Sequence, residues 1–193
     1  MQRKENQEMS RTDHQEQSLA KQLLLTFALH GYQKTSMQDL ANSAGLSRQS
    51  VYKKFGSKDK CYQWVIHTYL SNMYSEIFQI LDDNSLEASE GLEKTFDVFI
   101  GNAVEVIAKK HGTQVLDDTL KATHSSVEDW PLRFRTRLAD YLIRHKLAAE
   151  DNALGIAYTL ISAGKGLLVE ESSRESFTKN MAFIINSVKK ADV

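Results

Sequence analysis

The stretch from Lys58 to Leu81 limits what this chain can fold into more than any other part of the sequence. Its apolar residues recur three and four positions apart without a break, which is the spacing of one face of an α-helix. At 1.5 Å per residue, a single helix over this stretch is roughly 36 Å long. The chain of 193 residues has one proline and nine glycines, so few residues interrupt helices and a strand-and-turn architecture is not expected. The apolar positions of the stretch are Tyr62, Val65, Ile66, Tyr69, Leu70, Met73, Ile77, Ile80 and Leu81.

The formal net charge of -1 hides an uneven distribution along the chain. Residues 1–60 hold ten lysines and arginines against six acidic residues, a balance of +4. Residues 61–193 hold fourteen against nineteen, a balance of −5. A basic N-terminal part therefore precedes an acidic remainder, and non-specific attraction to nucleic acid comes from the basic part.

Two short helices joined by a tight turn are predicted directly before the long helix. Ser36 and Asp39 have the spacing of a capping box, which begins the first helix. Gly45 suits the left-handed backbone at its end, and Ser47 can cap the second helix. This is the pattern of a helix-turn-helix, whose second helix lies in the major groove of DNA; the alternative is a pair of small packed helices with a solvated basic face. The inner positions are Met37, Leu40, Ala41, Ala44, Val51 and Phe55.

Residues 1–17 are charged and rich in amides, so we expect a flexible N-terminal arm that buries almost nothing. The arm is either a frayed tail or a basic arm that reaches DNA through Arg3, Lys4 and Arg11. From Ser18 onward a helix is expected, and it completes a three-helix head. Its apolar stripe and C-cap are Leu19, Leu23, Leu24, Phe27, Ala28 and Gly31.

The sequence from about residue 19 to 70 resembles the TetR family of bacterial transcriptional regulators. The number and order of the matching residues carry the resemblance. Cys61 stands where the family commonly has a leucine, and this changes little because cysteine is a small apolar residue when buried. The matching residues are Phe27, Ala28, Gly31, Tyr32, Thr35, Ser36, Met37, Asp39, Leu40, Ala41, Ala44, Gly45, Leu46, Ser47, Val51, Tyr52, Phe55, Ser57 and Lys58.

The resemblance implies an all-α protein of about nine helices. Its parts are a helix-turn-helix DNA-binding domain over 18–60 and, over 61–193, a connector helix with a helical bundle for effector binding and dimerisation. It also implies a homodimer on a palindromic operator in double-stranded DNA. By similarity, Ser47, Arg48, Gln49 and Ser50 are placed to read bases, Thr35, Ser36, Tyr52, Lys53 and Lys58 are placed to hold phosphates, and Lys54 does either or is solvated.

In such proteins the last two long helices of each subunit form a four-helix bundle with their partners. Small and apolar residues in this sequence fit that arrangement. The alternative is that they complete the core of a single subunit. These residues are Ala157, Leu160, Ile161, Gly164, Gly166, Phe177, Met181 and Ile184.

A set of aromatic residues in the second half is a candidate lining for a pocket that takes an apolar or flat effector. The alternative is that these residues are core. A basic set, Arg133, Arg135, Arg137 and Arg144, either favours an anionic effector or forms a solvated helix face. We expect a repressor released by a small molecule, or else an effector-independent dimeric DNA-binding or architectural protein. The candidate pocket residues are Phe96, Phe99, Trp130, Phe134, Tyr141 and Tyr158.

No pattern in the sequence is typical of a catalytic or metal site. Cys61 and His67 lie six residues apart, on different faces of the expected helix. His111 and His124 lack the spacing of helical metal ligands, and no glycine-rich phosphate loop is present. We therefore expect no enzyme, no cofactor and no metal. A polar N-terminus and the lack of 18 consecutive apolar residues favour a cytoplasmic protein that does not enter membranes.

Overall fold

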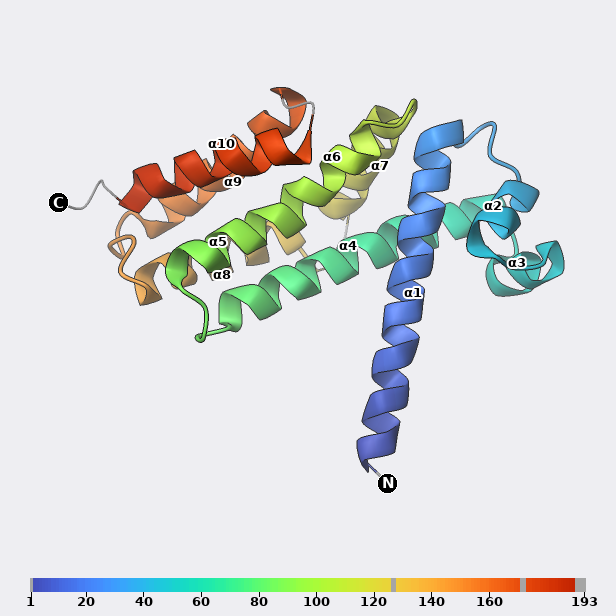
Figure 1. Cartoon of the computed structure of the whole chain (residues 1–193), viewed down its shortest axis with the longest axis horizontal. Helices are drawn as coiled ribbons and strands as arrows, with labels where there is room; N and C mark the ends of the chain where they lie inside the picture. The colour runs from blue at the N-terminus through green and yellow to red at the C-terminus, as the bar shows by residue number, and fades with distance from the viewer. Residues whose placement is uncertain (1, 126–127, 171–172, 190–193) are drawn as a thin grey trace. The chain divides into compact units, whose positions relative to one another are not determined.

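The computed structural model describes residues 2–125, 128–170 and 173–189, and these residues form helices and no strand (Figure 1). Because α5, η1 and α6 follow one another without a gap, the described residues form nine separate helices. This confirms the predicted all-α fold. The elements are α1 (Gln2–His30), α2 (Met37–Ala44), α3 (Arg48–Phe55), α4 (Lys58–Asp82), α5 (Ala88–Phe96), the π-helix η1 (Asp97–Gly101), α6 (Asn102–Ile107), α7 (Gly112–Ser125), α8 (Trp130–Arg144), α9 (Ala153–Glu170) and α10 (Arg174–Lys189).

The chain divides into two compact units. The head unit is residues 1–72 with 109–122, and the body unit is residues 73–108 with 123–193. The predicted long helix is confirmed as α4, which contributes residues 58–72 to the head unit and 73–82 to the body unit. The predicted functional boundary at residue 60 stays a prediction, because these units are defined by packing and not by function.

The first helix begins at Gln2, well before the predicted start at Ser18. Glutamate, glutamine, lysine and arginine favour helix by their intrinsic propensity, so α1 continues toward the N-terminus where no apolar stripe is left. The side chains of residues 2–14 lie outside the described part. The DNA contacts expected of Arg3, Lys4 and Arg11 therefore stay predictions.

The segment 109–122 belongs to the head unit through contacts with both α1 and α4. The backbone N–H of His111 donates to the carbonyl of Ala28 at 2.8 Å. Gly31 ends α1 with φ +79°, and a Cβ there would lie 3.1 Å from the His111 ring. The Tyr62 hydroxyl donates to Asp118 Oδ2 at 2.8 Å. The predicted three-helix head is thus extended by the first part of α7.

In the body unit, the π-helix η1 lies between α5 and α6 and interrupts one continuous helical stretch. Val98, Phe99, Ile100 and Gly101 are consecutive and all buried. A π turn adds about one residue to the helical register, so the apolar faces of α5 and α6 both point inward. Arg174 at the start of α10 binds the carboxylate of Asp97 through Nε at 2.8 Å, which fixes α10 beside the π turn.

Candidate nucleic-acid interface

The helix-turn-helix is built by the caps that the sequence predicts. The Ser36 backbone N–H donates to Asp39 Oδ2 at 2.8 Å, and the Asp39 backbone N–H donates to Ser36 Oγ at 3.2 Å. The hydrogen bond from the Ser36 side chain, followed by that from its backbone, lowers the pKa of Asp39. Gly45 ends α2 in the left-handed region at φ 62°. The capping box and the glycine C-cap are both confirmed.

The second helix, α3, is capped and oriented by residues at both of its ends. Ser47 Oγ accepts from the backbone N–H of Ser50 at 3.0 Å, and the two hydroxyls lie 2.8 Å apart. Val51 and Phe55 are buried, as predicted. The side chains of Ser47 and Ser50 are exposed and share one hydrogen bond. This bond uses only one of the two O–H groups, so the pair can still donate to a base.

One row of exposed side chains on α3 has the chemistry of a DNA-reading surface. Arg48, Gln49, Tyr52 and Lys53 are all exposed. The Arg48 guanidinium lies 5.5 Å from the centroid of the Tyr52 ring, a distance at which a cation is attracted to an aromatic face. Tyr52 therefore orients Arg48 in addition to any contact of its own.

Thr35, which was expected to contact a phosphate, is buried. It is 2% exposed, and its hydroxyl donates to the Gly31 carbonyl at 2.8 Å. The side chain satisfies the backbone at the end of α1, where helix carbonyls lack intrahelical partners. Thr35 is thus a structural residue in this conformation, and its expected phosphate contact is not supported.

Lys58 is half-buried, and its ammonium group has hydrogen-bond partners within the protein. Nζ donates to the carbonyls of Tyr32 at 2.8 Å and Gln33 at 3.2 Å, and it lies 4.6 Å from the Tyr32 ring centroid. An ammonium group has three N–H donors, so one remains for a phosphate. Lys58 holds the loop before α2 as well as any DNA it meets.

Lys54 also has protein partners that the sequence did not indicate. Its Nζ lies 2.9 Å from Glu16 Oε1 and 5.2 Å from the centroid of the Trp64 ring. Glu16 is on α1 and Trp64 is on α4, and no local spacing links either to Lys54. Lys34 and Lys60 are exposed lysines of the head unit that sequence reasoning did not assign; a count of basic residues beside Thr35 and Lys58 would have found them.

The aromatic residues expected to line a pocket mostly pack against one another in the body unit. The rings of Phe99 and Phe134 lie 4.9 Å apart, and Phe96 is 6.4 Å from Phe134. Trp130 stacks on Tyr74 at 5.5 Å. Tyr74 is buried but is absent from the apolar positions expected for the long helix, which include the neighbouring Met73. Any effector that uses this cluster must therefore separate its rings.

Two of the expected pocket residues lie apart from that cluster. Tyr141 is fully buried, and its hydroxyl donates to the Ala88 carbonyl at 3.0 Å. Tyr158 is 60% exposed, so its assignment to an enclosed pocket is wrong. It lies on the outer face of α9. The helical spacing of apolar residues in the sequence did not tell this outer face from the inner one.

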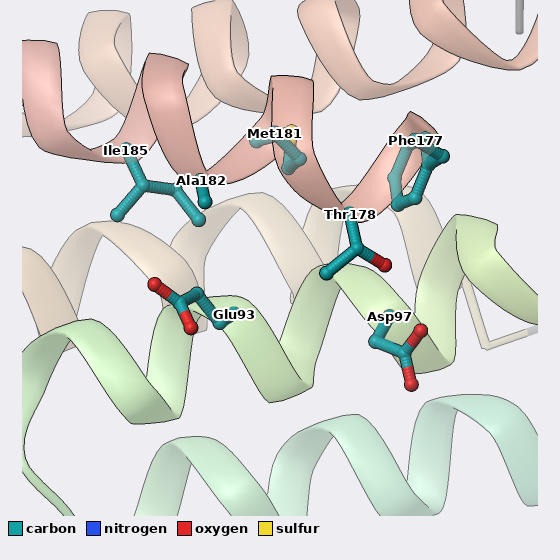
Figure 2. A pocket seen from close by; sticks show the side chains of 7 residues that line it. All are labelled: Glu93, Asp97, Phe177, Thr178, Met181, Ala182 and Ile185. Carbon is teal, nitrogen blue, oxygen red and sulfur yellow. The ribbon is translucent and has the colours of Figure 1, made fainter. Parts of the chain in front are cut away.

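A small hollow lies between α10 and the helix formed by α5 and η1 (Figure 2). Its volume of about 10 Å³ is the space that one water molecule needs, so it is too small for an effector. Asp97 at its edge is bound to Arg174. The lining residues are Glu93, Asp97, Phe177, Thr178, Met181, Ala182 and Ile185.

Three of the four arginines named on α8 bind groups of the body unit. Arg133 pairs with Glu128 at 2.8 Å, and Arg137 pairs with Asp82 at 2.7 Å. Arg144 donates to the carbonyl of Leu81 at the end of α4. These three arginines therefore bind groups of this chain. Their environment differs from both expectations, an anion-binding site and a solvated helix face.

The residues expected at a dimer interface are mostly buried within one chain. This burial follows from the packing of α9 against α8 and α10, and it supports the alternative that they complete the subunit's own core. Among the expected interface residues of α10, Ile184 is half-buried and the other two are buried. Those buried are Ala157, Leu160, Ile161, Gly164, Phe177 and Met181.

The opposite faces of α9 and α10 carry large apolar side chains in solvent. Val169 is 82% exposed and Phe183 is 75% exposed, and Leu154 and Tyr158 are similarly accessible. α9 is also long and apolar enough to cross a membrane, with 33% of its residues buried. Its inner face packs on α8 and α10, and a core helix of a globular protein passes the same test.

The described residues hold no group of three or more histidines, cysteines or acidic residues that could bind a metal ion. Burial raises the pKa of the Cys61 thiol to about 12. A thiol protonated at neutral pH is a poor nucleophile, so Cys61 is a packing residue of the head unit.

Comparisons with known proteins agree with the assignment of a helix-turn-helix to α2 and α3. The family model described as bacterial regulatory proteins, tetR family, matches residues 24–64, the part that contains the helix-turn-helix. The HTH-type transcriptional repressor KstR2 of Mycolicibacterium smegmatis is 32% identical over 90 residues, which are 47% of this chain and 42% of that protein. The match thus spans about two fifths of the relative's length.

Solved structures extend the likeness in fold to nearly the whole chain. A TetR transcriptional regulator from Legionella pneumophila has a TM-score of 0.59 and 19% identity, over 90% of this chain and 94% of that one. A transcriptional regulator from Rhodococcus sp. Rha1 has a TM-score of 0.62 and 18% identity, over 88% of this chain and 93% of that one. The helix-turn-helix part of this chain therefore matches the family model of bacterial regulatory proteins, tetR family, and nearly the whole chain shares the helical fold of solved TetR regulators.

Proposed function

We propose that this protein is a sequence-specific DNA-binding transcriptional regulator of the bacterial cytoplasm that represses its target from a palindromic operator. The exposed row Arg48, Gln49, Tyr52 and Lys53 on α3 carries the proposal. Arginine and glutamine form paired hydrogen bonds with guanine and adenine, respectively. Lysine neutralises phosphates without reading sequence. The match of residues 24–64 to the tetR family model supports the same function.

Selection of bound duplexes from random DNA tests this function directly. The expected result is one enriched sequence with two inverted half-sites, whose centres are about one helical turn, or 34 Å, apart. Binding with no enriched sequence would leave only non-specific affinity and would remove the proposal. The same selection returns the half-site that each recognition helix reads.

A two-fold operator requires two copies of α3, so we propose a homodimer. The exposed apolar faces of α9 and α10 support an interface there, because water around such side chains favours their burial. The face consists of Leu154, Tyr158, Val169 and Phe183. The residues expected from the sequence lie beneath this face and support it from the subunit core.

The release of the repressor by an apolar or flat effector is proposed for the body unit. The effector would enter among Phe96, Phe99, Trp130 and Phe134 and favour a conformer in which α4 moves and the two recognition helices no longer match the operator. A ligand shifts this equilibrium only if it binds the two conformers with different affinities. Operator affinity that stays constant in saturating ligand would exclude this mechanism.

The close packing of the same aromatic rings favours a second candidate, a dimeric DNA-binding protein that needs no effector. A thermal-shift screen with small apolar compounds separates the two. A ligand at 100 times its dissociation constant stabilises the folded state by about 2.7 kcal/mol. An effector-independent protein would keep its melting temperature throughout.

A further inference from the structure

We propose that Lys54 is a positioning residue that fixes the recognition helix α3 within the head unit and makes no contact with DNA. Its partners are Glu16 of α1, Phe55 of α3 and Trp64 of α4, and we call these three residues with Lys54 the Lys54 cage. The inference rests on the proposed DNA-binding function and assigns a specific role within it.

The Lys54 cage joins three helices at one ammonium group. Nζ forms an ion pair with Glu16 Oε1 at 2.9 Å. It also lies 5.2 Å from the ring centroid of Trp64 and 5.8 Å from that of Phe55, and these two rings pack 5.1 Å apart. The charge of Lys54 is thus compensated by a carboxylate and by two aromatic faces.

The position of Lys54 on α3 separates it from the DNA-reading row. Residues three and four apart share a face of a helix, so Lys53 shares the face of Gln49. Lys54 follows buried Val51 by three positions and exposed Ser50 by four, so it lies at the border between the inner face and the exposed face of α3. Both lysines are exposed, but the ammonium group of Lys54 turns toward Glu16 of α1 and Trp64 of α4.

A short recognition helix needs such a contact. α3 has eight residues, and isolated helices of this length are not stable in water. Its buried side chains are Val51 and Phe55, so few apolar contacts hold it. A cation near a helix C-terminus is also favoured by the helix dipole. The cage therefore fixes the last turn of α3, while Ser47 caps the first.

An exchange of the two charges tests the inference. The probe is the duplex enriched by the wild-type protein from random DNA. We expect Lys54→Glu to weaken its binding about tenfold or more, because two carboxylates then face each other and the two rings no longer attract a cation. The double variant Glu16→Lys with Lys54→Glu re-forms the ion pair at unchanged net charge but leaves the two rings without a cation, so we expect it to bind at least about threefold more tightly than Lys54→Glu and more weakly than wild type.

Lys53 supplies the matched control. Glu16→Lys should not rescue Lys53→Glu, because Lys53 lies outside the cage. The dependence of affinity on salt gives a second readout: Lys53→Ala should flatten the slope of log K against log salt by about 0.9 for each phosphate that is no longer neutralised, whereas Lys54→Ala should leave the slope unchanged. A merely structural defect would not separate the two lysines in this way.

Two results would overturn the assignment. One is a charge-exchanged variant as weak as Lys54→Glu, and the other is a salt slope that Lys54→Ala flattens as much as Lys53→Ala does. The first would show that the ion pair with Glu16 does not hold α3, and the second would show that Lys54 contacts phosphate. If the wild-type protein enriched no duplex at all, the proposed function would fail instead, so the two failures are distinguishable.

Discussion

Arg48 and Gln49 differ from Lys53 in what their side chains can recognise, although all three are exposed on α3. Replacement of Arg48 or Gln49 by alanine should cost about 1–3 kcal/mol on the selected operator and relax the preference for one base pair. Lys53→Ala should weaken binding to operator and random duplexes alike. Titration of each variant against both duplexes measures the difference. Equal losses on the two duplexes for Arg48→Ala would remove its base-reading role.

Residue roles set by local spacing could be predicted, whereas those set by tertiary contacts could not. Ser36 with Asp39 forms a capping box that needs four consecutive residues only. Thr35 has the composition of a phosphate ligand, but its burial depends on how α1 ends at Gly31. The partner of Lys54 lies on another helix, 38 positions away in the sequence. The helical spacing of the sequence shows on which face of a helix a side chain lies, but not which residues of other helices it contacts.

Among the helices, the contact of α5 with α8 depends on the absence of one side chain. A Cβ at Gly91 would overlap the hydroxyl of Tyr141 and lie 3.0 Å from its Cζ. Because the Tyr141 ring is fully buried, Gly91→Ala should destabilise the fold by about 1–3 kcal/mol. Urea unfolding of the purified variant measures this change.

A matched control lies on α9. Gly155 has no atom within 4 Å of an added Cβ, so Gly155→Ala should be neutral or stabilise by up to about 1 kcal/mol through helix propensity. Tyr141→Phe combined with Gly91→Ala should recover part of the stability, since the overlapping hydroxyl is gone. Equal stabilities of Gly91→Ala and wild type would show that α5 and α8 shift at little cost.

The existence of most helices could be predicted because apolar period is a strong signal over many residues. α4 matches its predicted span of Lys58 to Leu81 almost residue for residue. The π turn at Asp97–Gly101 escaped prediction, since one extra residue in the register changes the period only slightly. The extension of α1 to Gln2 escaped it as well, because a helix stabilised by propensity leaves no apolar stripe.

For the molecule as a whole, the exposed apolar face of α9 and α10 predicts the state of assembly. Leu154→Glu places a charge in the proposed interface, where burial without a partner is costly. We expect the variant to be a monomer at concentrations where the wild type is a dimer, with unchanged helix content. Sedimentation velocity measures the first and circular dichroism the second. Loss of the dimer should also weaken operator binding about 100-fold or more, because the second half-site no longer benefits from linkage.

Leu132→Glu on α8 is the matched control, because Leu132 is 47% exposed and Leu154 is 55% exposed, so both substitutions add one charge to an accessible leucine. Only the substitution on α9 should change the sedimentation coefficient. If both variants remained dimers, the interface would lie elsewhere and the exposed side chains of α9 and α10 would need another partner. If Leu154→Glu were monomeric but bound the full operator as tightly as wild type, one head unit would suffice for recognition, and the palindromic operator would be wrong.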